Sequence, residues 1–303
     1  MRTAILFLAL AWVGGLAAHA EEQTYAERLG WEKGDRVVIL HVDDIGMSHA
    51  SNRGAIEALE DGIATSVSIM MPCPWVPEFA EYLKKHPDTC AGLHLTMTSE
   101  WDYYRWGPVA GKPAVPGLVD PMGCLWDGNG LVYDHATPDE AEAEIRAQID
   151  RSLTMGIQPT HLDSHMGTLF YNPEYFERYM KVGIEKQIPI LMAKEFDAEA
   201  AEKVCKAGLP VLDYIFADTY DWKTTEKSPL YIDYLKNLKP GITEIIMHCT
   251  KPNDVIPIIT GNRDHLYGDL YAMVDPEVKK VVEEEGIILT NWREIAERRK
   301  NAE

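Results

Sequence analysis

The chain has 303 residues with 48 Asp and Glu against 29 Lys and Arg, which gives a formal net charge of −19 at pH 7. This acidity argues against nucleic acid and anionic membrane surfaces as partners, whereas it suits a small neutral or cationic substrate. The cysteines are few for the length and odd in number, so at least one thiol stays free, and their spacing matches no zinc knuckle. The sequence leaves open any disulfide pairing among Cys73, Cys90, Cys124, Cys205 and Cys249.

Residues 1–20 have the features of a secretory signal peptide. Arg2 supplies a positive charge, an apolar run follows over residues 4–13, and Ala18-His19-Ala20 forms an A-x-A cleavage site. The apolar run is shorter than the ~20 residues that span a bilayer. We therefore expect an exported protein, periplasmic or extracellular and without membrane insertion, whose mature chain is one domain over residues 21–303.

The first predicted strand, residues 37–45, ends in two adjacent carboxylates, Asp43 and Asp44. A run of β-branched residues such as this one is typical of a strand buried on both faces of a parallel sheet. Because burial of an unpaired carboxylate is costly, we expect the pair to lie at the end of the strand, where Gly46 lets the chain leave it. The alternative is a structural pair in which Asp44 caps the following helix.

Further strands alternate with helices along the chain. Strands are predicted at 65–71, 91–98, 158–167, 188–192, 211–216, 241–248 and 287–290, and helices at 51–61, 77–85, 138–156, 174–186, 197–207, 230–238 and 276–284. This order favours a parallel α/β sheet. With six to eight such units, we expect a single-domain, distorted (β/α) barrel similar to a TIM barrel rather than an open sheet.

Titratable side chains recur on these strands. His94 alternates with aliphatic residues and shares a face with two threonines, which leaves a site and a hydrogen-bonded core position equally open. His161, Asp163 and His165 share one face of the next strand, and such groups are costly to bury unless a metal or a proton-transfer network uses them. His248 ends a later aliphatic strand, as the aspartate pair does.

Residues 99–137 interrupt the pattern with many glycines and prolines and with scattered aromatic residues, including Trp101, Trp106 and Trp126. Long irregular segments inside compact domains are usually functional loops or lids. The aromatic rings could stack on sugar rings or could pack the loop onto the body of the protein, and the sequence does not decide between these roles.

Gathered at one end of a barrel, these strand-end groups predict metal-assisted hydrolysis. Two imidazoles and one carboxylate form a common catalytic ligand set for zinc, and the same types of ligand serve Fe(II). A carboxylate beside the ligands can accept a proton from the attacking water, and a titratable group opposite can protonate the leaving atom.

The chain resembles the YdjC-like carbohydrate deacetylases, which include chitooligosaccharide deacetylase. The resemblance rests on D-D-I-G at 43–46, N-R-G-A-I-E-A at 52–58, G-I-A-T-S-V-S-I-M at 62–70, G-L-H-L-T-M-T at 92–98, G-I-Q-P-T-H-L-D-S-H at 156–165 and M-H at 247–248. It implies a barrel that removes acetyl groups from N-acetylated sugars with one divalent metal ion, zinc or magnesium. It implies Asp44, His94 and His165 as metal ligands, Asp43 as general base, and His248 as acid or oxyanion stabiliser.

Four places depart from the family pattern. His41-Val42 replaces the usual Asn-Ala before the aspartate pair, and Ile45 replaces the usual Phe after it. Met166-Gly167 follows where further histidine is usual, and Cys249-Thr250 replaces Pro-Gly after His248. These changes put the identity of the sugar in doubt more than the reaction. The export signal also differs from the cytosolic members of the family.

Two other functions are weighed against the deacetylase: a metal-dependent hydrolase of another bond, such as a phosphoester, and a carbohydrate-binding barrel without turnover. Scarce Lys and Arg near the motifs weigh against phosphate, although Arg53 and Arg263 could be reached. The intact set of Asp and His residues weighs against a binder. The expected partners are a small carbohydrate substrate and, in a homodimer, a second copy of the chain.

Overall fold

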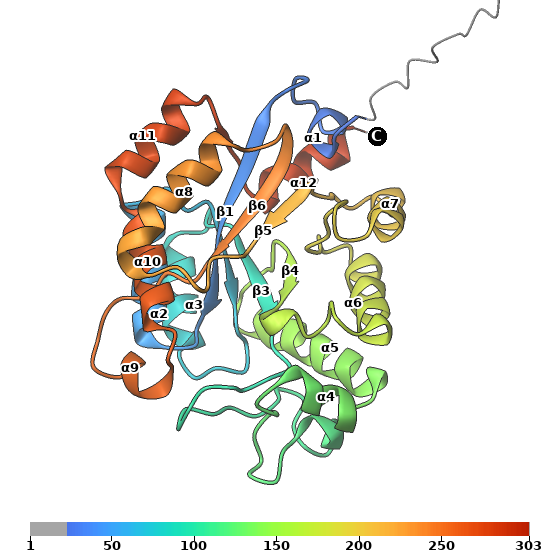
Figure 1. Ribbon diagram of the computed structural model, residues 1–303. Helices are drawn as coiled ribbons and strands as arrows, with labels where there is room; N and C mark the ends of the chain where they lie inside the picture. Colours follow the sequence, from blue (N-terminus) through green and yellow to red (C-terminus); the bar gives the residue numbers. More distant parts are fainter. Residues whose placement is uncertain (1–22, 303) are drawn as a thin grey trace, which may run out of the picture.

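A computed structural model describes residues 23–302, and its centre is a parallel sheet (Figure 1). The strands are β1 Arg36–Ile45, β2 Ser66–Ile69, β3 Ala91–Leu95, β4 Leu162–Ser164, β5 Tyr214–Phe216, β6 Gly241–Met247 and β7 Ile288–Leu289. Their order is β4-β3-β2-β1-β6-β5, with β7 paired to the first half of β1. Every pairing between strands is parallel.

Isolated bridges close this sheet into a distorted barrel. Leu162 of β4 pairs with Ile190, and Ala193 pairs with Leu212, just before β5. The predicted strand 188–192 therefore runs in the expected place but makes only single bridges. Pro189 contributes to this irregularity because it has no N–H to donate, while its carbonyl accepts from the Leu162 amide at 2.8 Å. The predicted barrel fold is confirmed.

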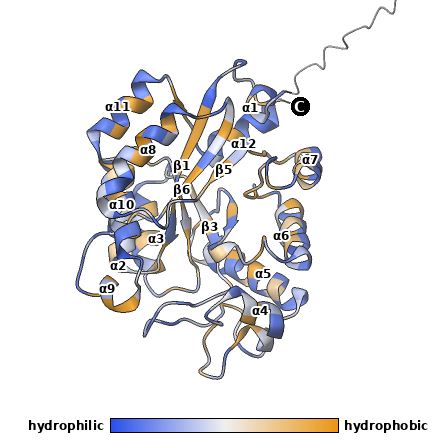
Figure 2. Ribbon diagram, viewed as in Figure 1, coloured by the Kyte–Doolittle hydropathy of each residue, from blue (hydrophilic) through white to orange (hydrophobic). Residues whose placement is uncertain are grey.

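Helices surround the strands (Figure 1). They are α1 Tyr25–Arg28, α2 His49–Glu60, α3 Val76–Lys85, α4 Asn129–His135, α5 Pro138–Thr154, α6 Pro173–Lys186, α7 Ala198–Lys206, α8 Lys227–Lys236, α9 Ile256–Ile259, α10 Arg263–Met273, α11 Pro276–Glu284 and α12 Trp292–Asn301. Every helix predicted from the sequence is present; α11 has the predicted bounds, and the others have shifted ends. Helices α1, α4, α9, α10 and α12 were not predicted. In Figure 2 the central strands are largely apolar, and the helices around them turn a polar face outward.

The alternation of β1 determines what lies inside the barrel. Val37 and Ile39 pack with Trp292 in an interior cluster, whereas Val38, Leu40 and Val42 belong to the larger core beneath the helices. With a period of two, His41 and Asp43 continue the interior face toward the carboxyl end of the strand. Trp292 of α12 closes the amino end, where its Nε1 donates to Glu244 Oε2 at 2.7 Å.

Strand β3 ends at Leu95, so the predicted strand over 91–98 is too long. The buried side chain of Gln148 on α5 replaces a neighbouring strand at this point. Its Oε1 accepts from the Thr96 amide at 3.0 Å, and its Nε2 donates to the Thr96 carbonyl at 2.7 Å. The face shared with Thr96 and Thr98 is lost, but His94 remains on the strand.

The segment 99–137 lies beyond the carboxyl ends of the strands and contains a 3-10 turn at Pro116–Leu118 and helix α4 (Figure 1). Trp106 is buried and donates to the Thr98 carbonyl at 2.9 Å, and Trp126 donates to the Gly117 carbonyl at 2.8 Å. Trp106 belongs to the large core cluster and Trp126 packs against it, so these two aromatic residues pack the loop onto the body.

The cysteines within the described residues are all free thiols. Cys249 is buried, and burial raises the pKa of its thiol well above the usual value, which fits a core residue rather than a nucleophile. Between residues 23 and 302, no helix has the length and apolar character needed to cross a bilayer. The predicted signal peptide lies outside the described residues and stays a prediction.

Candidate active site

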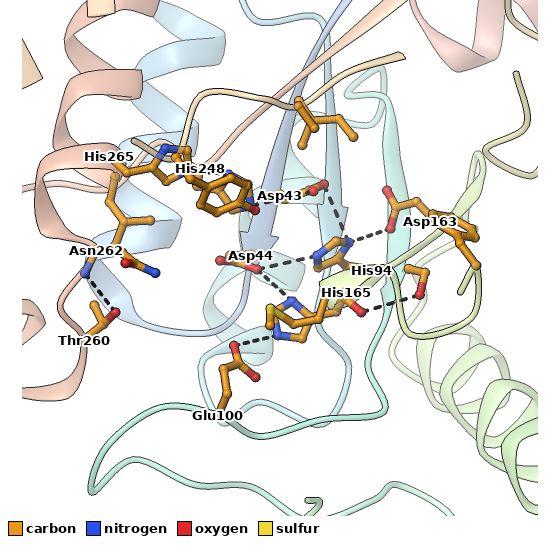
Figure 3. A pocket seen from close by; sticks show the side chains of 18 of the residues that line it. Asp43, Asp44, His94, Glu100, Asp163, His165, His248, Thr260, Asn262 and His265 are labelled. Carbon is orange, nitrogen blue, oxygen red and sulfur yellow. Dashed lines mark hydrogen bonds and ion pairs between the residues drawn. The ribbon is translucent and has the colours of Figure 1, made fainter. Parts of the chain in front are cut away.

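A cavity of about 840 Å³ opens at the carboxyl ends of the strands (Figure 3). This is the end of a (β/α) barrel at which active sites are built. The five residues predicted from the sequence all line it: Asp43, Asp44, His94, His165 and His248. They come from the ends of four strands that are far apart along the chain.

The three residues that the family resemblance implies as metal ligands converge on one point. Asp44 Oδ1 lies 3.6 Å from His94 Nε2 and 3.4 Å from His165 Nδ1, and all three side chains are buried. Their candidate ligand atoms lie within 4.8 Å of one another. Asp44 Oδ1 has no hydrogen-bond partner in the structure. A buried carboxylate oxygen without a donor, facing two imidazole nitrogens, fits a divalent cation.

The backbone of Asp44 makes this convergence possible. Regular alternation would point Asp43 and Asp44 to opposite faces, but Asp44 has a φ of 66°, in the left-handed region. This conformation is uncommon for a residue other than glycine and is typical of functional sites. Gly46 follows at a φ of 86°. The N-cap of α2 is Ser48, so the alternative in which Asp44 caps the helix is wrong.

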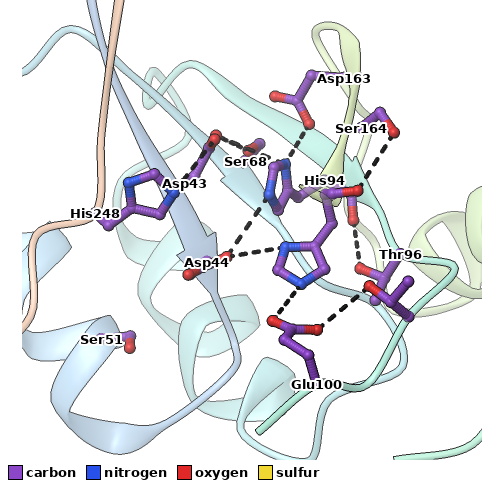
Figure 4. Close-up of polar contacts among 12 residues, drawn as sticks. Asp43, Asp44, Ser51, Ser68, His94, Thr96, Glu100, Asp163, Ser164 and His248 are labelled. Carbon is purple, nitrogen blue, oxygen red and sulfur yellow. Dashed lines mark hydrogen bonds and ion pairs between the residues drawn. The ribbon is translucent and has the colours of Figure 1, made fainter. Parts of the chain in front are cut away.

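Each imidazole is oriented by a carboxylate on its far side (Figure 4). His94 Nδ1 lies 2.7 Å from Asp163 Oδ1, and His165 Nε2 lies 2.8 Å from Glu100 Oε1. A carboxylate there fixes the proton on the outer nitrogen and leaves the inner lone pair for a metal. Glu100 was not identified from the sequence, because it lies in the irregular segment and belongs to no motif.

His161 does not reach the site, although it shares the face of Asp163. Strand β4 ends at Ser164, and His165 begins a 3-10 turn that carries it to the cavity. His161 remains deeper in the barrel, where its ring stacks on Trp292 with centroids 5.0 Å apart. Of the three titratable groups predicted to act together on this strand, only Asp163 and His165 line the cavity.

Asp43 lies beside the ligand cluster and has partners of its own. Its Oδ1 accepts from Ser68 Oγ at 2.8 Å and lies 3.0 Å from His41 Nε2. Burial raises the pKa of Asp43, but the nearby His94 and the contact with His41 outweigh burial and hold the pKa below its ordinary value. Asp43 is therefore ionised at neutral pH and can accept a proton.

His248 stands on the other side of Asp43 (Figure 3). Its Nε2 lies 3.1 Å from the hydroxyl of Tyr220 and 4.0 Å from Asp43 Oδ2. Behind it, Nδ1 contacts His265 Nε2 at 3.0 Å. The ring can therefore present Nε2 to a molecule in the cavity, opposite the cluster of Asp44 and His94.

Aromatic side chains form the outer walls of the cavity. They are Trp101, Phe170, Tyr171, Phe196 and Tyr220. Only Trp101 comes from the aromatic-rich segment 99–137, so the sequence pointed to the wrong part of the chain for most of them. Tyr171 is 70% exposed at the rim. Aromatic faces at a rim suit the C–H surface of a sugar ring.

Comparison with known proteins agrees with this architecture. The chain is 30% identical to a carbohydrate deacetylase of Thermus thermophilus, over 89% of this chain and 97% of that protein. It is 26% identical to a chitooligosaccharide deacetylase of Yersinia enterocolitica, over 85% of this chain and 98% of that one. A solved structure from Enterococcus faecalis V583, whose description refers to cellobiose-phosphate cleavage, has a TM-score of 0.74 at 24% identity, over 85% and 98% of the two chains.

The solved structure establishes the shared fold. The model of the YdjC-like protein family matches residues 37–284. This range includes all the residues that line the cavity. The chain belongs to the YdjC-like protein family.

Proposed function

We propose that this protein is a carbohydrate deacetylase that hydrolyses the acetyl amide of an N-acetylated sugar with one divalent metal ion. One observation carries the proposal: Asp44 Oδ1, which has no hydrogen-bond partner, lies close to ring nitrogens of His94 and His165. The ionised Asp43 lies beside this cluster. The names of the curated relatives, carbohydrate deacetylase and chitooligosaccharide deacetylase, support the same activity.

The residues of the site divide the work of amide hydrolysis. Asp44, His94 and His165 would hold the metal ion, which when bound supplies a Lewis acid for the acyl carbonyl and for water. Asp43, held by Ser68 and His41, accepts the proton of the attacking water. His248 faces the same space and can donate a hydrogen bond to the leaving nitrogen or to the developing oxyanion.

The ligand types favour zinc over magnesium, because two of the three are imidazoles and magnesium prefers oxygen ligands. The opposite nitrogens of both rings are already hydrogen-bonded to Asp163 and Glu100, as is usual for histidines that bind a metal. Zinc is therefore the metal we expect to restore most activity.

The walls of the cavity support a neutral sugar rather than a phosphorylated one. Among the described residues that line it, none is Lys or Arg, so a phosphate would find no ammonium or guanidinium group to bind it. The aromatic rings at the rim instead offer stacking surfaces. We propose an oligosaccharide with N-acetylated units as the substrate, met outside the cytoplasm if the signal peptide directs export.

An acetate-release assay on N-acetylglucosamine oligomers tests the proposed function. Protein treated with a chelator should release no acetate, and adding back zinc should restore release. Release of phosphate from phosphorylated sugars without acetate would instead show a phosphoesterase, and binding of oligomers without either product would show a binder. Cell fractionation and light scattering test the predicted export and homodimer separately.

A further inference from the structure

His248 is the outer end of a buried chain of polar groups that the proposed reaction does not yet explain. His265 and Asp269 lie on α10, four residues apart, and Lys227 begins α8. His248 Nδ1 contacts His265 Nε2 at 3.0 Å, and His265 Nδ1 contacts Lys227 Nζ at 2.8 Å. The chain therefore runs from the cavity through two imidazole rings to an amine.

Lys227 is fully buried, which is rare for lysine. Its Nζ lies 2.6 Å from Asp269 Oδ1, and Asp269 also accepts from Tyr231 Oη at 2.8 Å and from the His248 amide at 2.9 Å. Burial lowers the pKa of Lys227, but the charge of the Asp269 carboxylate and the hydrogen bond to it oppose burial, so the amine is held as an ammonium group. A Cβ on Gly268 would lie 2.5 Å from Lys227 Cγ, so glycine at this position makes room for the lysine stem.

The ammonium group dictates where the proton of His265 lies. An ammonium nitrogen only donates, so its contact with His265 Nδ1 is a hydrogen bond only if Nδ1 carries a lone pair. Burial lowers the pKa of His265 to about 4, so the ring is neutral at pH 7 and its single proton is on Nε2. That proton points to His248 Nδ1, which must accept it. A neutral His248 then carries its own proton on Nε2, facing the cavity.

The Tyr220 hydroxyl, 3.1 Å from His248 Nε2, can accept from that nitrogen or donate to it, so it fits either proton order. A different contact favours the opposite arrangement. The carbonyl of Thr219 lies 3.2 Å from His265 Nδ1 and could accept a proton from it. The proton order would then reverse along both rings, and His248 would present a lone pair at Nε2. The contact with the ammonium group is shorter and charge-assisted, so it is the stronger of the two. Without Lys227, the Thr219 carbonyl would decide instead.

We propose that Lys227 and His265 are positioning residues that hold His248 as the tautomer with its proton on Nε2. The catalytic use of this tautomer rests on the proposed deacetylase function, whereas the tautomer itself does not. His248 is thereby a hydrogen-bond donor toward the cavity, opposite the base Asp43. Two separate networks therefore set the two roles: Ser68 and His41 hold the proton acceptor Asp43, and His265 and Lys227 hold the proton donor His248.

Nitrogen-15 NMR of the histidine rings in the full-length protein tests the tautomer directly, because a protonated and an unprotonated ring nitrogen resonate far apart. We expect Nε2 of His248 to be protonated and Nδ1 unprotonated. In Lys227→Met, the Thr219 carbonyl should draw the proton of His265 to Nδ1 and reverse the tautomer of His248. Lys236→Met, an exposed change on the same helix, should leave it unchanged. Wild-type His248 with its proton on Nδ1 would overturn the proposal.

A pair of substitutions at His265 keeps the proposal testable if Lys227→Met does not fold. A glutamine can accept from Lys227 through its carbonyl oxygen and donate to His248 Nδ1 through its amide, whereas leucine can do neither. We expect His265→Leu to lower kcat for acetate release about tenfold or more at an unchanged KM, and His265→Gln to restore most of it. Equal rates and an unchanged His248 tautomer in the two variants would contradict the proposal.

The two readouts separate this inference from the proposed function. If no variant of the protein, wild type included, released acetate while His248 kept its proton on Nε2 only when Lys227 was present, the deacetylase proposal would fail and the tautomer proposal would stand. If acetate were released and the tautomer did not respond to Lys227, the reverse would hold.

Discussion

Two clusters of the same residue types lie on either side of Asp43, and they differ in what completes them. Asp44, His94 and His165 form one, and His248, His265 and Asp269 form the other; in each, the candidate ligand atoms lie within 4.8 Å of one another. In the first cluster, Asp44 Oδ1 has no hydrogen-bond partner. In the second, the ammonium of Lys227 contacts both the imidazole of His265 and the carboxylate of Asp269.

The difference teaches that residue type and proximity do not by themselves make a metal site. A resident ammonium group satisfies the carboxylate of Asp269 and one nitrogen of His265, so the second cluster already has its cation. In the first cluster, Asp163 and Glu100 contact the outer nitrogens of the two rings, so the inner nitrogens and the facing Asp44 Oδ1 stay available. Of these two clusters, we therefore expect the first to bind the divalent ion.

The largest expected effect is that of His94→Ala. The substitution removes one of three ligands, so both the bound metal and acetate release should fall to background. His265→Leu, in the second cluster, should keep the full metal content. Elemental analysis of the two purified variants makes the comparison. Retention of the metal in His94→Ala, or its loss in His265→Leu, would mean that the clusters have been assigned the wrong way round.

Asp43→Asn should have the next largest effect. The amide cannot accept the proton that the carboxylate takes, so kcat for acetate release should fall by about 10²–10⁴ while the metal content stays the same. Steady-state kinetics and elemental analysis on one preparation check both parts. An Asp43→Asn enzyme with normal turnover would show that another group is the base.

Glu100→Ala should weaken the metal site without destroying it. The substitution removes the acceptor of His165 Nε2, and loss of such a group typically costs about 10–100-fold in metal affinity. Competition with a chelator of known affinity measures the change. Glu60→Ala, which removes the carboxylate beside His86 on the surface, is the matched control. An affinity equal to that of the wild type would show that Glu100 does not orient the ligand.

Tyr171→Ala should have the smallest effect. Loss of one stacking face at the rim should raise KM for N-acetylated oligomers a few-fold and leave kcat unchanged. The reason is that the Tyr171 ring is exposed at the rim, whereas the ligand cluster is buried. Tyr103, which is 91% exposed and does not line the cavity, supplies the control Tyr103→Ala. A lowered kcat with unchanged KM would place Tyr171 in the chemistry instead.

The barrel and the strand-end residues could be predicted from the sequence because both depend on local patterns. An aliphatic run that ends on a titratable side chain marks the carboxyl end of a buried strand, and Asp43 and His248 follow this rule, whereas the alternation with aliphatic residues indicated His94. Asp44 reaches the site only through a left-handed backbone, whereas Gly46 indicated only that the chain leaves the strand there. The metal, the roles of the residues and the export of the protein remain predictions.

The supporting residues could not be predicted because tertiary contacts alone select them. Glu100 lies in an irregular segment, and Lys227 sits near one end of a helix whose first residues gave no apolar pattern. Helix α10, which carries His265, was missed because Gly268 lies in its interior and glycine disfavours a helix. The packing of Lys227 against Gly268 requires a glycine there. The residue that weakened the helical pattern therefore supports the network of Lys227, His265 and His248.

The most direct test of the account is the anomalous diffraction signal of zinc in crystals of the zinc-loaded protein. The account predicts one peak per chain, placed among Asp44 Oδ1, His94 Nε2 and His165 Nδ1, and none beside Lys227. A peak between His248 and Asp269, or no peak among the three predicted ligands, would contradict it.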